Sequence, residues 1–374
     1  MTGVEIAWRT LNMEQVEEPC ILASWAMKRD FYRHYAGVND IYADPVRTVV
    51  EAFANAGANL NPQFIMPSPT YEHIACAPER VVGAQITEPE EGPTPSPPQA
   101  RSPEDVRDAI EQMPGPETLE LEFNVEAAVE AYARPLLERR ELSRDRTLFI
   151  GGYGIPGFMS GYTTWGYENY MCALALYPEH LRRYYALSAE RGRLHNIAVV
   201  EAVRRYDLAP FAYTGDDICF NNGPICNPEI LNDLYFPALR HAVQPLIEAD
   251  IRMIWHCDGD VRPILPQLLD AGMSGFQGFQ EEAGVTLEGM AALRTRWGRK
   301  PILWGSVSVT TTLPFGTVED VKRRVEHCFE VAGPGGGFGL ASTSSILPET
   351  PLENIIALFE HGRAFGRHFY RSRS

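Results

Sequence analysis

The sequence lacks the features that would direct it to a membrane, to export or to nucleic acid. No stretch of its 374 residues approaches the roughly 18–20 uninterrupted apolar residues of a membrane span. The first eleven residues carry Glu5 and Arg9 among few apolar side chains and do not resemble a secretory signal. Positive charge is scarce: 33 Lys plus Arg stand against 49 Asp plus Glu, and the net charge of −16 disfavours polyanionic partners. We therefore expect a cytoplasmic protein with neither nucleic acid nor a membrane as partner.

The seven cysteines do not form a disulfide framework. They are odd in number and scattered along a chain without an export signal, so we expect reduced thiols, free for packing or ligation. The composition, 45% apolar and 22% charged, is that of a globular protein rather than of a disordered chain.

Eight short β-rich runs recur along the chain, each followed by a segment with helical spacing. They cover 20–25, 58–64, 147–152, 210–214, 252–256, 275–279, 301–305 and 337–341. This alternation predicts an α/β protein built as a single TIM (β/α)8 barrel over 1–374, with an N-terminal leader before the first strand. An open, doubly wound sheet is the structural alternative.

The helices between these strands are expected at 45–56, 124–140, 166–204, 228–248, 261–271, 286–297, 317–331 and 351–369. Thr317 is suited to an N-cap and Pro351 to a first helical turn, while Gly272 and Gly298 are typical of C-terminal caps. Residues 87–103 hold six prolines and no large apolar residue. Such a run predicts an exposed proline-rich loop inserted between the second and third strands.

Polar side chains follow the strands, at the barrel end where catalytic residues gather in this fold. The richest cluster is His256-Cys257-Asp258. Alternation along a strand points His256 and Asp258 to one side and Cys257 to the other. This pair fits a metal site with Asp217 or Glu281 as third ligand, a hydrogen bond that orients a general base, or a polar pair at the rim.

Two further groups are candidates for binding a substrate. Of the adjacent Asp216 and Asp217 only one can face the barrel axis, where it suits acid–base chemistry, while the other caps a loop. Lys28, Arg29 and Arg33 form a cationic cluster after the first strand, which suits an anionic substrate or a solvated helix face.

The part of the chain from 147 to 369 resembles the uroporphyrinogen decarboxylase superfamily, in particular its corrinoid-dependent methyltransferase branch. The matching stretches are 166–170, 177–181, 215–217, 227–229, 254–259, 313–318, 335–338 and 347–354. The resemblance implies a TIM barrel, in agreement with the strand count. The sequence also departs from the pattern of true uroporphyrinogen decarboxylases, because Asn59 and Asn61 stand where an Asp is expected and Ser344 takes the place of a His.

Zinc-dependent methyltransferases of this superfamily bind metal through a His-x-Cys motif and a later Cys. Here Asp258 stands at the first cysteine position and Ser344 at the second, so the resemblance implies a harder N/O site formed by His256, Asp258 and Glu281, with zinc as one candidate ion. Other members of the branch work without that zinc site.

We therefore expect a methyltransferase that moves a methyl group between a small methylated substrate and a corrinoid carried by a partner protein. His256, Asp217 and Asp258 are the predicted catalytic residues. The predicted substrate-binding residues are Trp25, Arg29, Arg33, Asn61, Tyr153, Tyr213, Glu281 and Ser344. The alternatives are a decarboxylase or lyase acting on a small carboxylated substrate, and a non-catalytic binding barrel.

Overall fold

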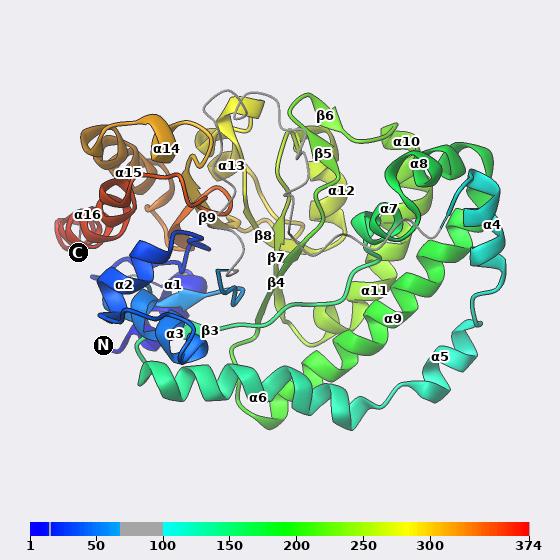
Figure 1. Cartoon of the computed structure of the whole chain (residues 1–374), viewed down its shortest axis with the longest axis horizontal. Helices are drawn as coiled ribbons and strands as arrows, with labels where there is room; N and C mark the ends of the chain where they lie inside the picture. The colour runs from blue at the N-terminus through cyan, green and yellow to red at the C-terminus, as the bar shows by residue number, and fades with distance from the viewer. Residues whose placement is uncertain (15, 68–99, 374) are drawn as a thin grey trace. The chain divides into compact units, whose positions relative to one another are not determined.

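The computed structural model (Figure 1) describes residues 1–14, 16–67 and 100–373. The chain divides into two compact units. Unit 1 comprises Met1–Pro97, Arg139–Leu148 and Gly305–Ser374, and unit 2 comprises Pro98–Glu138 and Phe149–Trp304. Among the described residues no helix has both the length and the apolar character needed to cross a membrane.

Unit 1 is built from both ends of the chain. Its elements are α1 (Gly3–Leu11), β1 (Cys20–Ile21), α2 (Arg29–Ala36), α3 (Pro45–Ala56), β2 (Leu60–Asn61), α14 (Thr312–Phe315), α15 (Val318–Ala332), β10 (Phe338–Ser342) and α16 (Leu352–Arg371). Strand β1 pairs in parallel with β10, and a parallel bridge joins Leu22 to Leu60. Helices α15 and α16 pack together, and the buried ring of Phe329 lies against Phe365 and Phe369.

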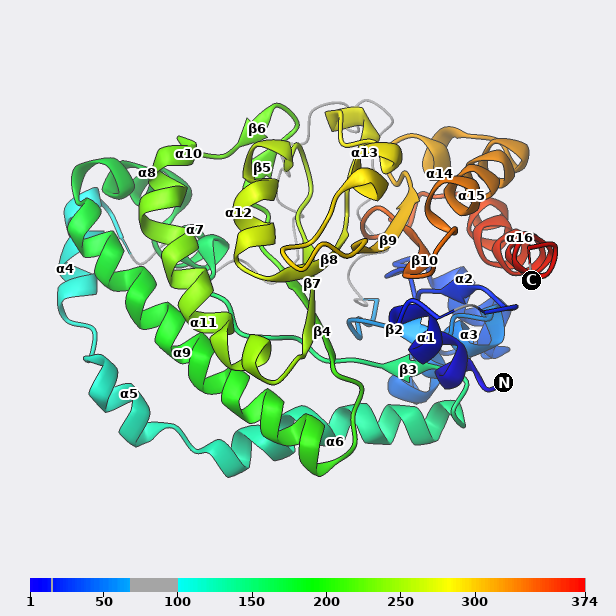
Figure 2. The same cartoon turned by 180° about the vertical axis from the view of Figure 1, so that it is seen from behind.

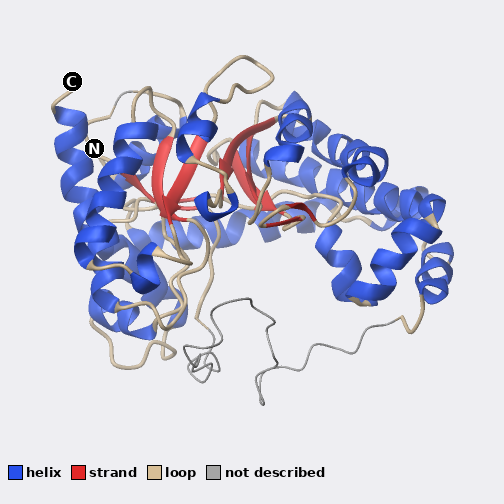
Figure 3. Ribbon diagram, turned by 90° about the horizontal axis from the view of Figure 1, so that it is seen from above, coloured by secondary structure: helices blue, strands red, loops and turns tan. Residues whose placement is uncertain are grey.

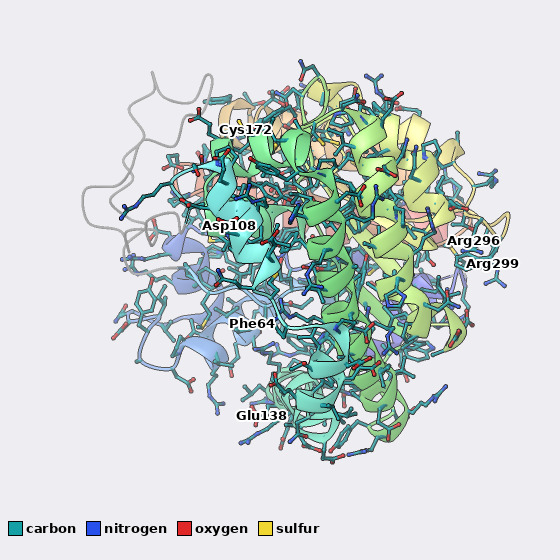
Figure 4. All side chains as sticks on the ribbon, turned by 90° about the vertical axis from the view of Figure 1, so that its right-hand side faces the viewer. Phe64, Asp108, Glu138, Cys172, Arg296 and Arg299 are labelled. Atoms are coloured by element: carbon teal, nitrogen blue, oxygen red, sulfur yellow. The ribbon has the colours of Figure 1, made fainter. Side chains whose placement is uncertain are left out.

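Unit 2 holds the longer helices. Its elements are α4 (Pro103–Glu111), α5 (Pro116–Glu122), α7 (Phe158–Trp165), α8 (Tyr167–Leu176), α9 (Pro178–Arg205), β4 (Phe211–Gly215), β5 (Cys219–Phe220), β6 (Gly223–Pro224), α10 (Pro228–Ile230), η3 (Leu231–Tyr235), α11 (Phe236–Glu248), β7 (Arg252–His256), η4 (Arg262–Ile264), α12 (Leu265–Asp270), β8 (Met273–Gln277), η5 (Glu281–Ala283) and α13 (Leu287–Ala292). Helices α9 and α11 run side by side (Figure 2), and α4, which carries Asp108, packs on α8, which carries Cys172 (Figure 4). Three elements, α6 (Val125–Ser143), β3 (Leu148–Phe149) and β9 (Ile302–Val307), run across the division.

The strands that position the candidate site belong to unit 2. Strands β4, β7, β8 and the first half of β9 are parallel neighbours in that order. Runs such as Met253-Ile254-Trp255 are buried along their whole length, because a parallel sheet has helices on its outer face and packed side chains on the other. Figure 3 shows the strands in red with helices beside them.

All eight predicted strands are present, as β1, β2, β3, β4, β7, β8, β9 and β10, which confirms an α/β fold with parallel strands. The hairpin of β5 and β6 was not predicted. The sixth strand lies two residues earlier than expected, because the left-handed backbone of Gly278 (φ 87°) ends β8 at Gln277. Closure into one eight-stranded barrel and the assignment of 1–374 to a single domain stay predictions.

Several helix boundaries differ from the predicted ones for local reasons. The helix expected over 166–204 is interrupted at Tyr177, because Pro178 has no N–H and begins α9. Helix α13 ends at Ala292 rather than at 297. At this end, the side chain of Arg294 donates hydrogen bonds to the carbonyls of Ala292 and Leu293. Thr317 forms the predicted N-cap, with a full capping box to Asp320, whereas Pro351 is itself an N-cap and α16 begins one residue later.

The predicted proline-rich loop lies outside the described residues over 87–99. Of its last four residues, Ala100 is buried, and Ser102 and Pro103 form the start of α4. The side chain of Ser102 accepts the N–H of Asp105, and Pro103 occupies the first helical turn, where its missing N–H leaves no bond unmade.

Candidate functional site

Three neighbouring strands of unit 2 end at the same level. The register pairs Gly215 of β4 with His256 of β7, and His256 with Gln277 of β8. Asp217 and Asp258 each follow two residues after the last residue of their strands. Because the carboxyl ends of parallel strands share one edge, these polar side chains gather in one place.

The imidazole of His256 is oriented by a side-chain amide. Its Nδ1 lies 2.6 Å from Oε1 of Gln277, and the same oxygen accepts a hydrogen bond from the hydroxyl of Tyr213 at 2.8 Å. An amide oxygen only accepts, so the neutral ring carries its proton on Nδ1 and presents the lone pair of Nε2. This hydrogen bond therefore selects the tautomer of His256.

The Nε2 atom of His256 faces two carboxylates. It lies 3.5 Å from Oδ1 of Asp217 and 4.0 Å from Oδ1 of Asp258. Asp217 also accepts the backbone N–H of Asp258 at 2.9 Å, which ties the loop after β4 to the loop after β7. The side chain of His256 is 19% exposed and those of Asp217 and Asp258 are 38% and 32% exposed, so each side chain keeps some accessible surface, although Oδ1 of Asp258 is itself buried.

Asp216 has a different role from its neighbour Asp217. Its buried carboxylate accepts the N–H groups of Phe158 and Met159, at the start of α7, and the hydroxyl of Tyr235. Burial raises the pKa of Asp216 to about 6, against the lowering effect of these hydrogen bonds. Asp216 therefore holds α7 against the end of β4, while Asp217 faces His256.

The nearby thiols do not share the face of His256 and Asp258. Cys257 is buried, and its Sγ donates to the carbonyl oxygen of Asp258 at 3.2 Å. Hydrogen bonding to Cys219, together with burial, holds the pKa of the Cys257 thiol well above its usual range. Cys257 is therefore a neutral packing residue.

Two glycines leave the room that His256 occupies. A Cβ at Gly278 would overlap Nδ1 of the imidazole, and one at Gly215 would overlap the carbonyl oxygen of His256. Gly278 also has a φ of 87°, a region that other residues rarely adopt. The close approach of β4 and β8 to His256 thus depends on the absence of side chains at these positions.

Asp217, His256 and Asp258 fit a divalent cation. One ligand atom from each lies within 4.8 Å of the other two. Because Zn–N and Zn–O bonds are about 2.1 Å long, two ligands of a tetrahedral ion lie about 3.4 Å apart, which is near the 3.5 and 4.0 Å measured from Nε2. The donors are one nitrogen and carboxylate oxygens, which suit an ion of intermediate hardness rather than thiolate-bound zinc. The hydrogen bond from Nδ1 to Gln277 is the outer-shell contact that metal-binding histidines usually make.

Tyr153 and Glu281, predicted from sequence as substrate-binding residues, also belong to unit 2. Tyr153 is buried, and its hydroxyl donates to the carbonyl of Ile254 at 3.4 Å. Glu281 begins η5, and its carboxylate accepts the N–H of Leu287 at 3.5 Å. Of the two third ligands considered, the structure brings Asp217 rather than Glu281 together with His256 and Asp258.

The cationic cluster after β1 belongs to unit 1, and its members have local partners. Lys28 donates to the carbonyl of Pro348 at 2.8 Å, and Arg33 forms an ion pair with Asp30 at 3.0 Å. The guanidinium of Arg29 lies 5.4 Å from the centre of the Tyr42 ring. These contacts fit the alternative of a solvated helix face.

The other predicted residues of unit 1 are Trp25, Asn61 and Ser344. Trp25 and Asn61 are buried. Ser344 is half-buried, and its carbonyl accepts the hydroxyl of Ser342 at 2.7 Å. As with every predicted site residue, their roles stay proposals.

Sequence reasoning missed Gln277, Gly278 and Tyr235. The predicted sixth strand, 275–279, ends two residues after β8, so its end pointed to Glu281 rather than to Gln277. The signal was present as a glycine directly after a β-rich run, the position where a left-handed residue ends a strand. Tyr235 lies far from Asp216 in sequence and carried no local signal.

Comparisons with known proteins agree with this architecture. The profile of the uroporphyrinogen decarboxylase (URO-D) family matches residues 77–365. Methylcobamide:CoM methyltransferase MtaA of Methanosarcina barkeri (strain Fusaro / DSM 804) is 28% identical over 174 residues, which are 46% of this chain and 45% of the relative. A second MtaA of Methanosarcina barkeri is 29% identical over 146 residues, or 38% of this chain and 40% of the relative.

The chain thus spans less than half the length of these curated relatives. A solved methyltransferase from Methanosarcina mazei has the same fold, with a TM-score of 0.63 and 20% identity over 98% of this chain and 99% of its own. The chain belongs to the uroporphyrinogen decarboxylase family, and its predicted resemblance to the methyltransferase-like branch is confirmed.

Proposed function

We propose that this protein is a methyltransferase that moves a methyl group between a small substrate and a corrinoid carried by a separate protein. One observation carries the proposal. A His256 of fixed tautomer faces two carboxylates at the ends of parallel strands, in a family member whose curated relatives are named methylcobamide:CoM methyltransferases.

The proposed chemistry concerns a proton as well as a methyl group. When a thiol, an amine or a hydroxyl accepts a methyl group, its lone pair would form the new bond to the methyl carbon and its proton would be lost. The bond between the methyl group and the corrinoid of the partner would break at the same time, and its electron pair would stay with the corrinoid. Nε2 of His256 would take that proton, and Asp217 and Asp258, at 3.5 and 4.0 Å from Nε2, would stabilise the resulting imidazolium. In the reverse direction the same atoms return the proton to the departing group.

A divalent cation is the second way in which this cluster would act. His256, Asp217 and Asp258 would hold the ion, which would lower the pKa of a bound thiol or hydroxyl. Gln277 and Tyr213 would then fix the direction of the His256 lone pair. Metal content, measured by mass spectrometry on protein purified without chelators or a histidine tag, separates the two modes.

The test is methyl transfer from methylcobalamin to a panel of small thiols that includes CoM. The transfer is monitored by the appearance of the cob(I)alamin spectrum. We expect His256→Ala to lower the rate by about 10²–10⁴-fold, the usual contribution of a positioned acid–base group. The matched control is His368→Gln, a histidine on the exposed side of α16. Absence of transfer for every acceptor, or an equal loss in both variants, would count against the proposal.

Decarboxylation of a small carboxylated substrate is the second candidate, favoured by the name of the family and by Lys28, Arg29 and Arg33. The local partners of Lys28 and Arg33 weaken it. Charge reversal at Arg29 and Arg33 would abolish binding of a carboxylated substrate if this candidate were right, and would leave methyl transfer to a thiol unchanged if the methyltransferase proposal is right.

A further inference from the structure

A polar cavity lies wholly within unit 1. It has a volume of about 480 Å³ and is bordered by the start of α1, the segment before β1, the end of α3 and the last turns of α16. Four arginines line it, Arg146, Arg363, Arg367 and Arg371, against two carboxylates, Glu17 and Glu18. In a protein whose net charge is −16, this is a local excess of positive charge.

The two glutamates neutralise only one pair of these arginines. Glu18 accepts hydrogen bonds from Arg367 and Arg371, each at 2.8 Å, and Glu17 lies 3.9 Å from Arg371. These pairs hold the two guanidinium groups of α16 in place along one side of the cavity.

The other two arginines are not matched by an acidic group. Arg146 donates through Nε to the carbonyl of Ser143 and through Nη1 to the amide oxygen of Asn55, and both of these partners are neutral. Within the part of the chain that the structure describes, neither Arg146 nor Arg363 forms an ion pair with a carboxylate. Two positive charges therefore line one cavity without compensation.

The backbone makes room for one of these charges. A Cβ at Gly57 would overlap the side chain of Arg363 at Cδ, and Gly57 closes α3 with a φ of 91°. The Arg363 side chain thus lies against the C-terminal turn of α3, and Arg363 is also exposed to solvent, where an anion can reach it.

We propose that this cavity binds a small oxyanion of the phosphate class. Guanidinium groups match the geometry of phosphate oxygens and donate paired, charge-assisted hydrogen bonds to them. The volume lies within the range of about 300–1,000 Å³ that holds small organic ligands, so the phosphoryl group of a metabolite fits as well as the free ion. The site is independent of the cluster around His256 and of the proposed methyl transfer.

The test is isothermal titration of the full chain with inorganic phosphate and with glucose 6-phosphate, at constant ionic strength. Binding of both with similar affinity identifies the phosphate group alone as the ligand, and tighter binding of glucose 6-phosphate identifies an organic phosphate. Both outcomes support the site. If neither inorganic phosphate nor glucose 6-phosphate binds, the proposal is overturned.

Three variants locate the binding. We expect Arg363→Gln to weaken phosphate by about tenfold, the effect of losing one charge-assisted contact. The matched control, Arg296→Gln with Arg299→Gln, removes charge from the surface turn after α13 (Figure 4) and should leave the affinity unchanged. Glu18→Gln should tighten binding, because it removes a negative charge from the cavity wall. Equal weakening by Arg363→Gln and by the control would show a general charge effect and would refute the proposal, as would weaker binding by Glu18→Gln.

Discussion

The buried carboxylate of Asp216 gives a prediction about stability and pH. Asp216 is 3% exposed and accepts the N–H of Met159 at 3.0 Å, the hydroxyl of Tyr235 at 3.1 Å and the N–H of Phe158. Its pKa is raised to about 6, with burial as the main cause. The perturbation is Asp216→Asn, which keeps the shape of the side chain and removes its titration.

The sign follows from proton binding in the two states. In the unfolded chain an aspartate loses its proton near pH 4, so between about pH 4 and pH 6 the folded protein holds a proton that the unfolded chain has released. The contribution of Asp216 to the free energy of unfolding is therefore fully present below pH 4 and falls as the pH rises through 6. A shift of about two pH units corresponds to a loss of about 3 kcal/mol.

The assay is urea unfolding at pH values from 4 to 8, monitored by tryptophan fluorescence, to which the buried Trp165 at the end of α7 contributes. The stability of the native protein minus that of Asp216→Asn should fall by about 3 kcal/mol across this range. In Tyr235→Phe this fall in stability should move to higher pH. The hydroxyl of Tyr235 stabilises the ionised carboxylate, so its removal raises the pKa of Asp216 further. A difference that is flat, or that rises with pH, would refute the reasoning.

Three further predictions concern single contacts. Gln277→Leu should lower methyl-transfer activity by about 10–100-fold, because the imidazole of His256 loses the acceptor that fixes its tautomer; kinetics of this variant beside Gln277→Glu, which keeps an acceptor, check this. Gly278→Ala should destabilise the fold by about 1–3 kcal/mol, measured by thermal unfolding, because the new methyl group overlaps His256 in a left-handed backbone. Glu190→Gln should remove stability that the native protein has above about pH 4.5 and loses as the pH falls toward 2, because Arg193 lowers the pKa of Glu190 to about 2; acid unfolding curves measure it.

The fold was largely predictable because its signals are local. Each strand is a short run of buried apolar residues, and helices such as α3 and α15 carry their own caps at Asp44 and Thr317. Helix α7 was not predictable in this way. It starts at Phe158 after a glycine, and its first N–H groups are satisfied by Asp216, which lies 58 residues further along the chain.

The candidate site was predictable only as far as strand ends and alternation reach. These placed His256, Asp217 and Asp258 at one edge of the sheet, and the structure has all three within ligand distance of one another. They did not give Gln277, because that residue faces His256 only in a register set by the left-handed turn at Gly278. The unit 1 residues Arg29 and Arg33 were predicted from their charge alone, and their role in binding a substrate stays a prediction.

Alternation also decides which donors the candidate site offers. Asp216 and Asp217 are adjacent. Asp216 accepts the N–H of Met159 at the start of α7, while Asp217 faces His256. Cys257 and Asp258 are adjacent as well, and the thiol is buried against Cys219 while the carboxylate stays half-exposed near Nε2. Since successive side chains of an extended segment point to opposite sides, no change of rotamer brings the sulfur of Cys257 to the position of the Asp258 carboxylate. The N/O character of the cluster is therefore fixed by the backbone together with the identity of residue 258, and a thiolate at this place requires a substitution there.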